Sequence, residues 1–206
     1  LRYIVLNPYW NVPRSIAVNE ILPKVKKDPA YLGEHHYQLL SGWQDAAIID
    51  PRTIDWDGVY AGNFTWRIRQ KPGPWNSLGL LKFMFPNKHN VYIHDTPHKH
   101  LFKARERTFS HGCIRCQDPV RLAVFLLKDD PEWSPERIRE VLKREKRKIV
   151  TPAGNCMVEV TYATAWVSEM GVLHFRKDVY DRDQVLWEAL TRESTYRGEP
   201  VLSVRD

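Results

Sequence analysis

The residues best suited to chemistry lie close together near the middle of the chain. Cys113 follows His111 and Gly112, and a second histidine, His94, ends a short apolar run upstream. The thiolate is the reactive form of cysteine, so a catalytic Cys needs a neighbouring imidazole or positive charge, and Arg115 is the nearest fixed positive charge. Gly112 permits a sharp turn that would direct backbone N–H groups toward a substrate oxygen. This set predicts a cysteine nucleophile with a histidine base.

Two other interpretations of the same residues stay open at this point. A lone cysteine is most often a small buried hydrophobic residue, with the nearby histidines at the surface. Cys113 and Cys116, together with the surrounding histidines, also supply enough ligand types for a tetrahedral zinc site. The second half of a structural zinc motif is missing, so no metal is expected.

The pattern around Cys113 resembles the signature of the L,D-transpeptidase (YkuD) family. In that family a His in an apolar strand is followed by a Ser/Thr-His-Gly-Cys block, and here His94 precedes Ser110-His111-Gly112-Cys113. The flanking words, residues 92–97 and 113–119, are similar to those of the subfamily of large periplasmic L,D-transpeptidases that includes YcbB. Cys116 departs from the pattern, because an aliphatic residue is expected at that position.

The resemblance implies acyl transfer through a cysteine thioester. Cys113, as a thiolate paired with protonated His94, would attack the carbonyl on the L-centre of diaminopimelate in a tetrapeptide stem and expel the terminal D-alanine. The amine of a second stem would then attack the thioester and form a 3→3 cross-link in peptidoglycan. An imidazole with an ordinary pKa of about 6.5 suits both proton transfers.

The resemblance also implies the partners and the location. Donor and acceptor tetrapeptide stems would be the substrates, a carbapenem-type β-lactam would be a covalent inhibitor, and no cofactor is expected. The expected location is the periplasm of a bacterial envelope. A cysteine protease would share the Cys and the His but transfer the acyl group to water, and a non-catalytic wall-binding module would not need Cys113.

Several residues are expected to complete the site. His111 either polarises the site or fixes the turn. Arg115 would hold a substrate carboxylate, unless it forms an ordinary ion pair with Asp118. Tyr92 would line the pocket, since strand alternation places it on the same face as His94, although a packed strand aromatic is an alternative.

Two further roles rest on the resemblance alone. Trp10, in an Asn-Pro-x-Trp-x-Val-Pro segment, would line the cleft, with packing in the core as the alternative. The main-chain carbonyl of Asn90 would orient His94.

The elements that must position these residues indicate a mostly β, α+β domain with peripheral helices, which the resemblance implies is a YkuD-type β-sandwich. Apolar and alternating runs predict strands, and caps and helical periodicity predict helices. The expected strands are residues 1–6, 67–70, 78–85, 91–94, 158–163 and 173–175. The first expected helix begins at a Ser15 cap, with a break at Pro23. The others cover residues 29–40, 119–127, 135–147 and 182–190, and Asp118 is expected to cap the helix over residues 119–127.

The resemblance divides the chain into two parts. Residues 1–16 and 67–206 would form the catalytic domain, and residues 17–66 would form an inserted substrate-capping subdomain that moves as a lid. Composition shows residues 17–66 only as a mixed, aromatic-rich segment without a clear core of its own.

Composition narrows the class of protein further. The net charge is +6, but the basic residues are interspersed with acidic ones, which argues against nucleic-acid binding and suits an anionic cell-wall polymer. The sequence has no apolar run of about 18 residues, so no membrane span is expected. Because the chain begins at Leu1 inside an apolar run, we expect it to be a piece of a longer polypeptide.

Three cysteines leave at least one thiol unpaired, and a pairing of Cys116 with Cys156 would leave Cys113 free.

Overall fold

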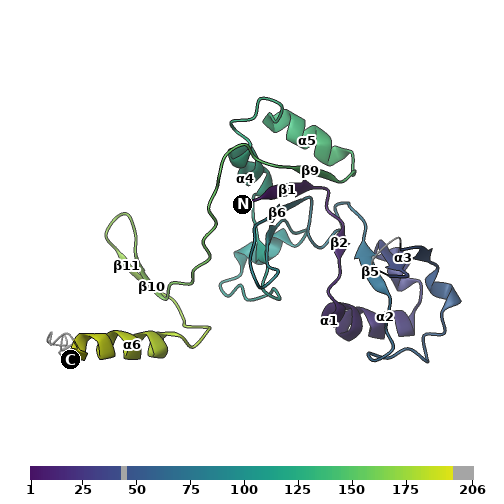
Figure 1. Cartoon of the computed structure of the whole chain (residues 1–206), viewed down its shortest axis with the longest axis horizontal. Helices are drawn as coiled ribbons and strands as arrows, with labels where there is room; N and C mark the ends of the chain where they lie inside the picture. The colour runs from purple at the N-terminus through teal and green to yellow at the C-terminus, as the bar shows by residue number, and fades with distance from the viewer. Residues whose placement is uncertain (43–45, 197–206) are drawn as a thin grey trace. The chain divides into compact units, whose positions relative to one another are not determined.

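The computed structural model describes residues 1–42 and 46–196, with side chains up to residue 192. The chain forms two compact units, Leu1–Val158 and Glu159–Asp206 (Figure 1). The larger unit carries all the residues proposed for chemistry. The mixed sheets and the few helices agree with the expected α+β class.

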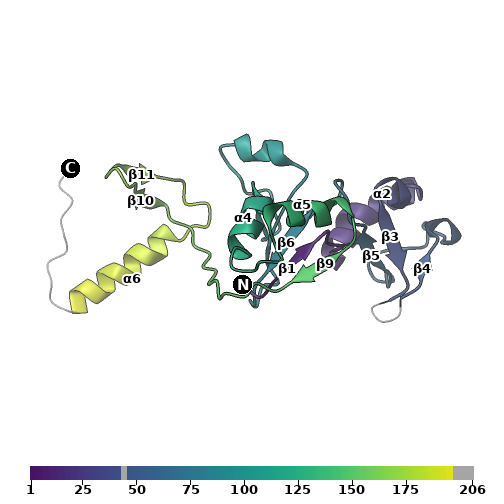
Figure 2. The ribbon, with the colours of Figure 1, turned by 90° about the horizontal axis from the view of Figure 1, so that it is seen from above.

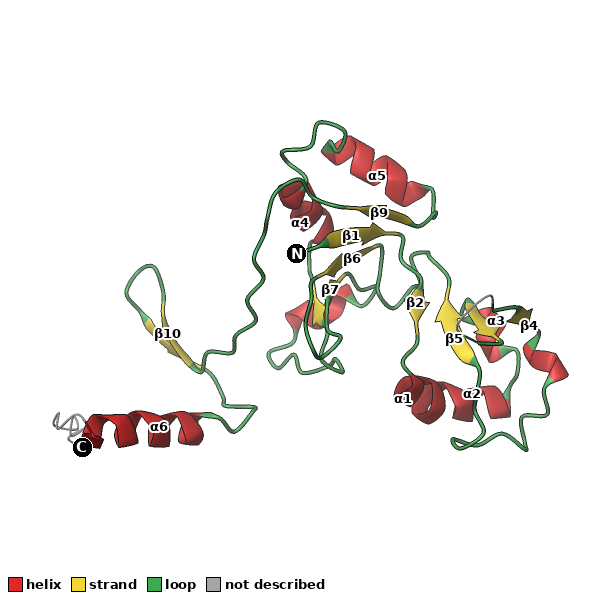
Figure 3. Cartoon of the chain, viewed as in Figure 1, coloured by secondary structure: helices red, strands yellow, loops and turns green. Residues whose placement is uncertain are grey.

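The first sheet of the larger unit has five strands in the order β8-β7-β6-β1-β9 (Figure 3). Neighbouring strands are antiparallel except β7 and β8, which run parallel. The connection between these two strands contains a 3₁₀ turn, η3 (Lys99–Lys103). The strands are β1 (Tyr3–Leu6), β6 (Leu81–Met84), β7 (Ile93–His94), β8 (Ile114–Arg115) and β9 (Lys148–Val150).

One face of this sheet builds the first hydrophobic core. Alternation in β6 sends Leu81 and Phe83 into this core, and both are fully buried. Strands β1 and β9 contribute further apolar side chains. Two helices, α4 (Pro119–Leu126) and α5 (Pro135–Lys143), add Ala123, Ile138, Val141 and Leu142 to the same cluster (Figure 2). The Asp118 side chain caps α4 by accepting from the backbone N–H of Arg121, as the sequence predicts.

The second sheet has four antiparallel strands in the order β2-β5-β3-β4. These strands are β2 (Trp10–Asn11), β3 (Tyr37–Leu40), β4 (Ile48–Ile49) and β5 (Arg67–Gln70). Residues 67–70 therefore pair within this sheet and do not rejoin the first one, contrary to expectation. A short 3₁₀ turn, η2 (Pro51–Thr53), follows β4.

Residues 17–66 have a hydrophobic core, which the composition did not reveal. The buried cluster consists of Val12, Ala17, Ile21, Leu22, Val25, Leu32, Leu39, Trp56, Val59, Phe64 and Ile68. Most of these residues fall inside the segment expected to form a lid. The function of the segment as a lid, and its boundaries, remain predictions.

The first helical stretch runs through three segments, α1 (Arg14–Ile16), η1 (Ala17–Ile21) and α2 (Leu22–Lys27). It begins after Pro13, so the expected cap at Ser15 is wrong. The stretch also passes Pro23 without ending. Proline lacks an N–H and its ring crowds the preceding turn, and the wide π turn of η1 accommodates both effects.

The helix expected over residues 29–40 is mostly wrong. Only α3 (Tyr31–Glu34) is helical, and His36 then takes a φ of 58°, which reverses the chain direction. Residues 37–40 form β3, because they find hydrogen-bonding partners in β5. Tertiary pairing overrides local helical preference here.

Two buried asparagines hold the segments that connect the two sheets. The Asn76 amide donates to the carbonyl oxygens of Pro8 at 3.0 Å and Lys71 at 2.8 Å, while its own oxygen accepts from the N–H of Leu78 at 2.8 Å. Asn7 donates to the carbonyl of residue 141 at 3.0 Å. The Asn76 bonds tie the exit from β1 to the loop that precedes β6, and the Asn7 bond ties it to α5.

The smaller unit contains a hairpin and a helix. The hairpin consists of β10 (Ala165–Val167) and β11 (Leu173–Phe175), and the helix is α6 (Asp183–Tyr196). The expected strand over residues 158–163 is wrong, because the paired strand lies further along the chain at β10. Within residues 1–42 and 46–196, no helix is long and apolar enough to cross a membrane.

Candidate active site

The candidate site is built where β7 and β8 lie side by side. The parallel register places His94 beside Arg115. The N–H of Ile114 donates to the Tyr92 carbonyl at 3.0 Å, and the N–H of Cys116 donates to the His94 carbonyl at 2.7 Å. Backbone pairing alone therefore brings together two motifs that are far apart in the sequence.

Alternation along these strands places the chemically interesting side chains on one face. Tyr92 and His94 share a face of β7, while Ile93 between them packs against the first core. In the same register Cys113 and Arg115 lie beside Tyr92 and His94. One face thus carries the thiol, the imidazole, a phenol and a guanidinium.

Tyr92 contacts the proposed nucleophile directly. Its hydroxyl donates a hydrogen bond to the sulfur of Cys113, which is half-buried. Burial, negative charge on Cys113 and this hydrogen bond all raise the pKa of Tyr92, so the phenol stays protonated and remains a donor. The Tyr92 ring also meets the His94 ring edge-on, with 5.7 Å between centroids.

His94 is buried, with 6% of its surface exposed, and its orientation is fixed by the next residue. Its Nδ1 atom hydrogen-bonds to the carbonyl oxygen of Asp95, and not to that of Asn90 as expected. Asn90 lies exposed in the preceding loop with a φ of 53°. With Nδ1–H donating to a carbonyl, Nε2 keeps the lone pair that a base needs.

The charge state of His94 differs from the expected one. Burial is the largest effect on the pKa of His94, Asp95 opposes it, and the positive charges of Arg115 and Lys82 add to it. Together these effects lower the pKa to about 4. His94 is therefore neutral at neutral pH. The low pKa argues against the expected resting pair of a thiolate and a protonated His94, and it favours a neutral imidazole that accepts the thiol proton.

Lys82 is part of this site, although the sequence did not single it out. It lies on β6 directly opposite His94 in the register. Its Nζ lies 3.8 Å from the centroid of the Tyr92 ring. One feature of the sequence could have pointed to it: Lys82 is a single lysine inside an apolar strand. A charged residue at such a position requires that one face of the sheet is open to a polar site.

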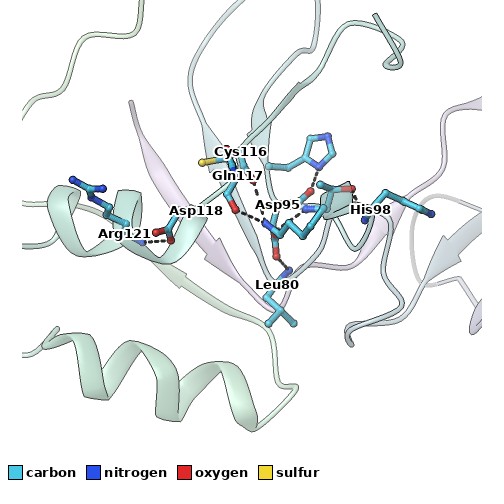
Figure 4. Close-up of polar contacts among 10 residues, drawn as sticks. Leu80, Asp95, His98, Cys116, Gln117, Asp118 and Arg121 are labelled. Atoms are coloured by element: carbon cyan, nitrogen blue, oxygen red, sulfur yellow. Dashed lines mark hydrogen bonds and ion pairs between the residues drawn. The ribbon is translucent and has the colours of Figure 1, made fainter. Parts of the chain in front are cut away.

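Asp95 is buried and anchors the strand end that carries His94 (Figure 4). Its carboxylate accepts from the N–H of Leu80 at 2.9 Å and from that of Thr96 at 2.7 Å. Gly79 makes the close approach possible, because a Cβ on it would lie 2.3 Å from the Asp95 carboxylate. The carboxylate thus ties the start of β6 to the end of β7.

Lys99 extends this network to the strand that follows the nucleophile. Its Nζ lies 2.5 Å from the Asp95 carboxylate and donates to the carbonyls of Gln117 at 2.7 Å and Cys116 at 3.3 Å. Figure 4 shows that Asp95, Cys116 and Gln117 lie close together. The pair of Asp95 and Lys99 therefore links the backbone next to His94 with the backbone after Cys113.

Gly112 adopts a backbone conformation that favours glycine, with a φ of 121°. A Cβ on it would lie 3.3 Å from Cγ1 of Val91. Its N–H donates to the Ser110 hydroxyl at 3.2 Å, so in this conformation that N–H faces into its own turn. The expected turn is present, and the oxyanion role of Gly112 remains a prediction.

His111 is exposed and points to the segment expected to form the lid. Its Nε2 lies 3.2 Å from a carboxylate oxygen of Glu20, which belongs to η1.

Arg115 is half-buried, and its guanidinium donates to the carbonyl of Phe109 at 3.5 Å. Trp10 packs against the second core, with its ring 6.3 Å from that of Tyr37. The catalytic role of His111 and the binding roles of Arg115 and Trp10 remain predictions.

The cysteines and histidines of the described residues form neither a disulfide nor a metal cluster. Cys113, Cys116 and Cys156 are all free thiols, so the pairing of Cys116 with Cys156 is absent. Within the described part of the chain, no three His, Cys, Asp or Glu side chains gather in a way that could hold a metal ion.

Comparison with known proteins agrees with this arrangement. A "Putative L,D-transpeptidase" of Haemophilus influenzae (strain ATCC 51907 / DSM 11121 / KW20 / Rd) is 34% identical over 184 residues, which cover 89% of this chain. The match spans 36% of that relative, so the chain corresponds to only part of its length. Residues 1–141 match the YkuD family, described as the L,D-transpeptidase catalytic domain. The chain belongs to the YkuD family of L,D-transpeptidase catalytic domains.

Proposed function

We propose that this chain is the catalytic domain of a peptidoglycan L,D-transpeptidase that forms 3→3 cross-links through a Cys113 thioester. The observation that carries the proposal is the parallel pairing of β7 and β8, which brings the strand that begins after Cys113 alongside the strand that ends at His94. The family membership supplies the reaction class. The flanking words around the site further suggest the YcbB-like subfamily and a periplasmic location.

The first half of the reaction acylates the enzyme. The neutral Nε2 of His94 takes the proton of the Cys113 thiol, and the sulfur attacks the carbonyl on the L-centre of diaminopimelate. A C–S bond forms, and the oxygen takes the negative charge. When the intermediate collapses, the C–N bond to D-alanine breaks and the departing nitrogen receives the proton held by His94.

The second half transfers the acyl group to another stem. The side-chain amine of an acceptor stem gives a proton to His94 and attacks the thioester carbonyl. The C–S bond then breaks, and Cys113 leaves as a thiolate that recovers the proton from His94. A pKa of about 4 makes His94 a weak base that returns its proton readily, which suits a group that must donate in both collapse steps.

Other residues would bind the substrate around this centre. Arg115 would hold a stem carboxylate, because a guanidinium presents a fixed pair of donors to a carboxylate. The Tyr92 hydroxyl, which already donates to the sulfur, would stabilise the thiolate. Residues 17–66 would cap the bound stem, with the contact between Glu20 and His111 joining the cap to the nucleophile loop.

Intact-mass measurement after incubation with a carbapenem-type β-lactam tests the proposal. The thiolate opens the β-lactam ring, so one adduct with the full mass of the drug is expected on the wild-type chain. Cys113→Ala must abolish the adduct, and Cys116→Ala, which removes a neighbouring thiol, must keep it. An adduct that survives Cys113→Ala would contradict the nucleophile assignment.

Product analysis with a tetrapeptide muropeptide then tests the acceptor. A cross-linked dimer with release of D-alanine is expected. A tripeptide product alone, even with acceptor amines in excess, would mean that water takes the acyl group and that the transferase assignment is wrong.

A further inference from the structure

Lys82 is a charged residue on an otherwise apolar strand, and it faces the candidate site. Leu81 and Phe83 on either side of it are fully buried in the first core, so Lys82 projects from the opposite face of the sheet. On that face it is the register partner of His94. The strand thus carries a positively charged side chain next to the proposed base.

The Lys82 ammonium is held in place by the Tyr92 ring. Its Nζ lies 3.8 Å from the ring centroid, a cation–π distance, and the same ring carries the hydroxyl that donates to the Cys113 sulfur. Tyr92 therefore contacts the cation with its face and the nucleophile with its hydroxyl. Lys82 is half-buried, so water screens its charge only in part.

The surroundings of Lys82 show which group balances its charge. Burial lowers the pKa of Lys82, Arg147 lowers it further, and negative charge on Cys113 is the effect that raises it. His94, Arg115 and Tyr92 are the other titratable groups on this face, and none of them is an anion at neutral pH. The thiolate that forms on Cys113 when the thiol loses its proton is thus the anion that the half-buried ammonium would face.

We propose that Lys82 is an electrostatic partner of the nucleophile: its ammonium, held over the Tyr92 ring, stabilises the Cys113 thiolate that forms when His94 takes the thiol proton. This inference rests on the proposed function, because it assigns Lys82 a role in the same proton transfer. The step moves one proton from sulfur to Nε2, and no group other than the thiol and the imidazole gains or loses a proton.

The same charge acts on both products of the transfer, with opposite signs. Lys82 attracts the thiolate but repels the imidazolium of His94. Among the effects on the pKa of His94, that of Lys82 is the smallest, whereas Cys113 exerts the largest charge effect on Lys82. We therefore expect attraction of the thiolate to exceed repulsion of the imidazolium, and the direction in which a charge-removing variant changes the reactivity of the thiol decides between the two.

The rate of Cys113 alkylation by iodoacetamide, followed by peptide mass mapping across a pH series, tests the proposal. Lys82→Met keeps a long side chain over the Tyr92 ring but removes the charge. We expect this variant to lower the rate at about pH 7 by about tenfold, and the loss to shrink at alkaline pH, where the thiolate forms without help. Lys82→Arg must retain most of the wild-type rate.

Matched controls separate this effect from general changes. Lys27→Met removes an equal charge at the exposed end of α2 and must leave the profile unchanged. Cys116 and Cys156 are read in the same peptide map and must keep their rates. Circular dichroism checks folding, and if Lys82→Met is not folded, Lys82→Gln carries the same expectation.

The outcomes are decisive in both directions. A Cys113 rate that is unchanged in Lys82→Met would overturn the proposal, and a faster rate would show that repulsion of His94 dominates, which also overturns it. Because alkylation needs no cross-linking activity, these results stay separate from the carbapenem test. A wild-type chain that forms no carbapenem adduct would refute the proposed function, whatever the alkylation profile shows.

Discussion

The ammonium of Lys99 lies 2.5 Å from the buried carboxylate of Asp95 and at the same time reaches the carbonyls of Gln117 and Cys116. Asp95 provides the carbonyl that orients His94, and Cys116 is three positions after the nucleophile. One ion pair therefore joins the residue that orients His94 to the backbone that follows Cys113. The sequence motif names the two residues proposed to react but says nothing of this connection.

Lys99→Met should weaken both the fold and the site. The Asp95 carboxylate keeps its two backbone donors but loses its cation, so we expect the free energy of unfolding to fall by about 1–3 kcal/mol. Lys99 is partly exposed, which places the loss below that of a fully buried pair. Urea denaturation measures the change in stability, and the rate of carbapenem acylation measures the change in the site.

Lys103→Met is the matched control, since Lys103 is an exposed residue of the same turn η3. It should change neither quantity. Equal effects of the two variants would mean that the loss of any positive charge from this turn matters and that the contact with Asp95 does not.

The depressed pKa of His94 predicts that stability depends on pH. The pKa is about 4 in the folded chain and about 6.5 in the unfolded chain, so the unfolded state binds the proton first as the pH falls. The contribution of His94 to stability is fully present above about pH 6.5 and is lost as the pH falls to about 4. The expected loss across this window is about 3 kcal/mol.

Urea denaturation of the wild-type chain and of His94→Gln across this pH range isolates the effect. Other groups titrate in both proteins, so only the difference between the two curves reports His94. Parallel curves through the window would show that His94 is not buried in its neutral form. Acylation by a carbapenem should likewise lose its base only as the pH approaches about 4.

The sequence predicted the parts of the structure that depend on local pattern. The apolar run over residues 1–6 contains β1, and Asp118 caps α4 as expected. The alternation of Tyr92, Ile93 and His94 correctly gave the two faces of β7, because side-chain direction in a strand follows directly from residue order. The motif also predicted a close approach of two distant segments, since it resembles that of a known family.

The rest depends on contacts between distant residues. Residues 37–40 became a strand because β5 offers them partners, and no local signal reveals a partner. The role of Lys82 and the low pKa of His94 both follow from cross-strand pairing and burial. The carbonyl that orients His94 was assigned to Asn90 by resemblance, whereas the local turn delivers that of Asp95.

Gly112→Ala should disturb the nucleophile turn. An alanine at a φ of 121° is strained, and its Cβ would lie 3.3 Å from Val91, so we expect a loss of stability of about 1–3 kcal/mol. Cys113 is the next residue, so the acylation rate should fall as well. Gly154→Ala is the control, because a Cβ there meets no atom within 4 Å. Unchanged acylation in a destabilised Gly112→Ala would mean that the sulfur position does not depend on this turn.

Asn76→Ala should loosen the connection between the two sheets. The variant leaves the carbonyls of Pro8 and Lys71 and the N–H of Leu78 without their buried partner, which we expect to cost about 3 kcal/mol of unfolding free energy in urea denaturation.

Asn63→Ala provides the matched comparison. Asn63 also bonds two backbone groups, those of Tyr60 and Gly58. It is exposed, so water can replace these bonds and the loss of unfolding free energy should stay below about 1 kcal/mol.

Asn76→Ala should also speed proteolytic cleavage between the first sheet and residues 17–66 if these two parts move relative to each other as a catalytic domain and its lid. Cleavage is compared at a denaturant concentration where both variants remain folded. Equal cleavage rates in the two variants would show that Asn76 stabilises the chain without restraining that motion.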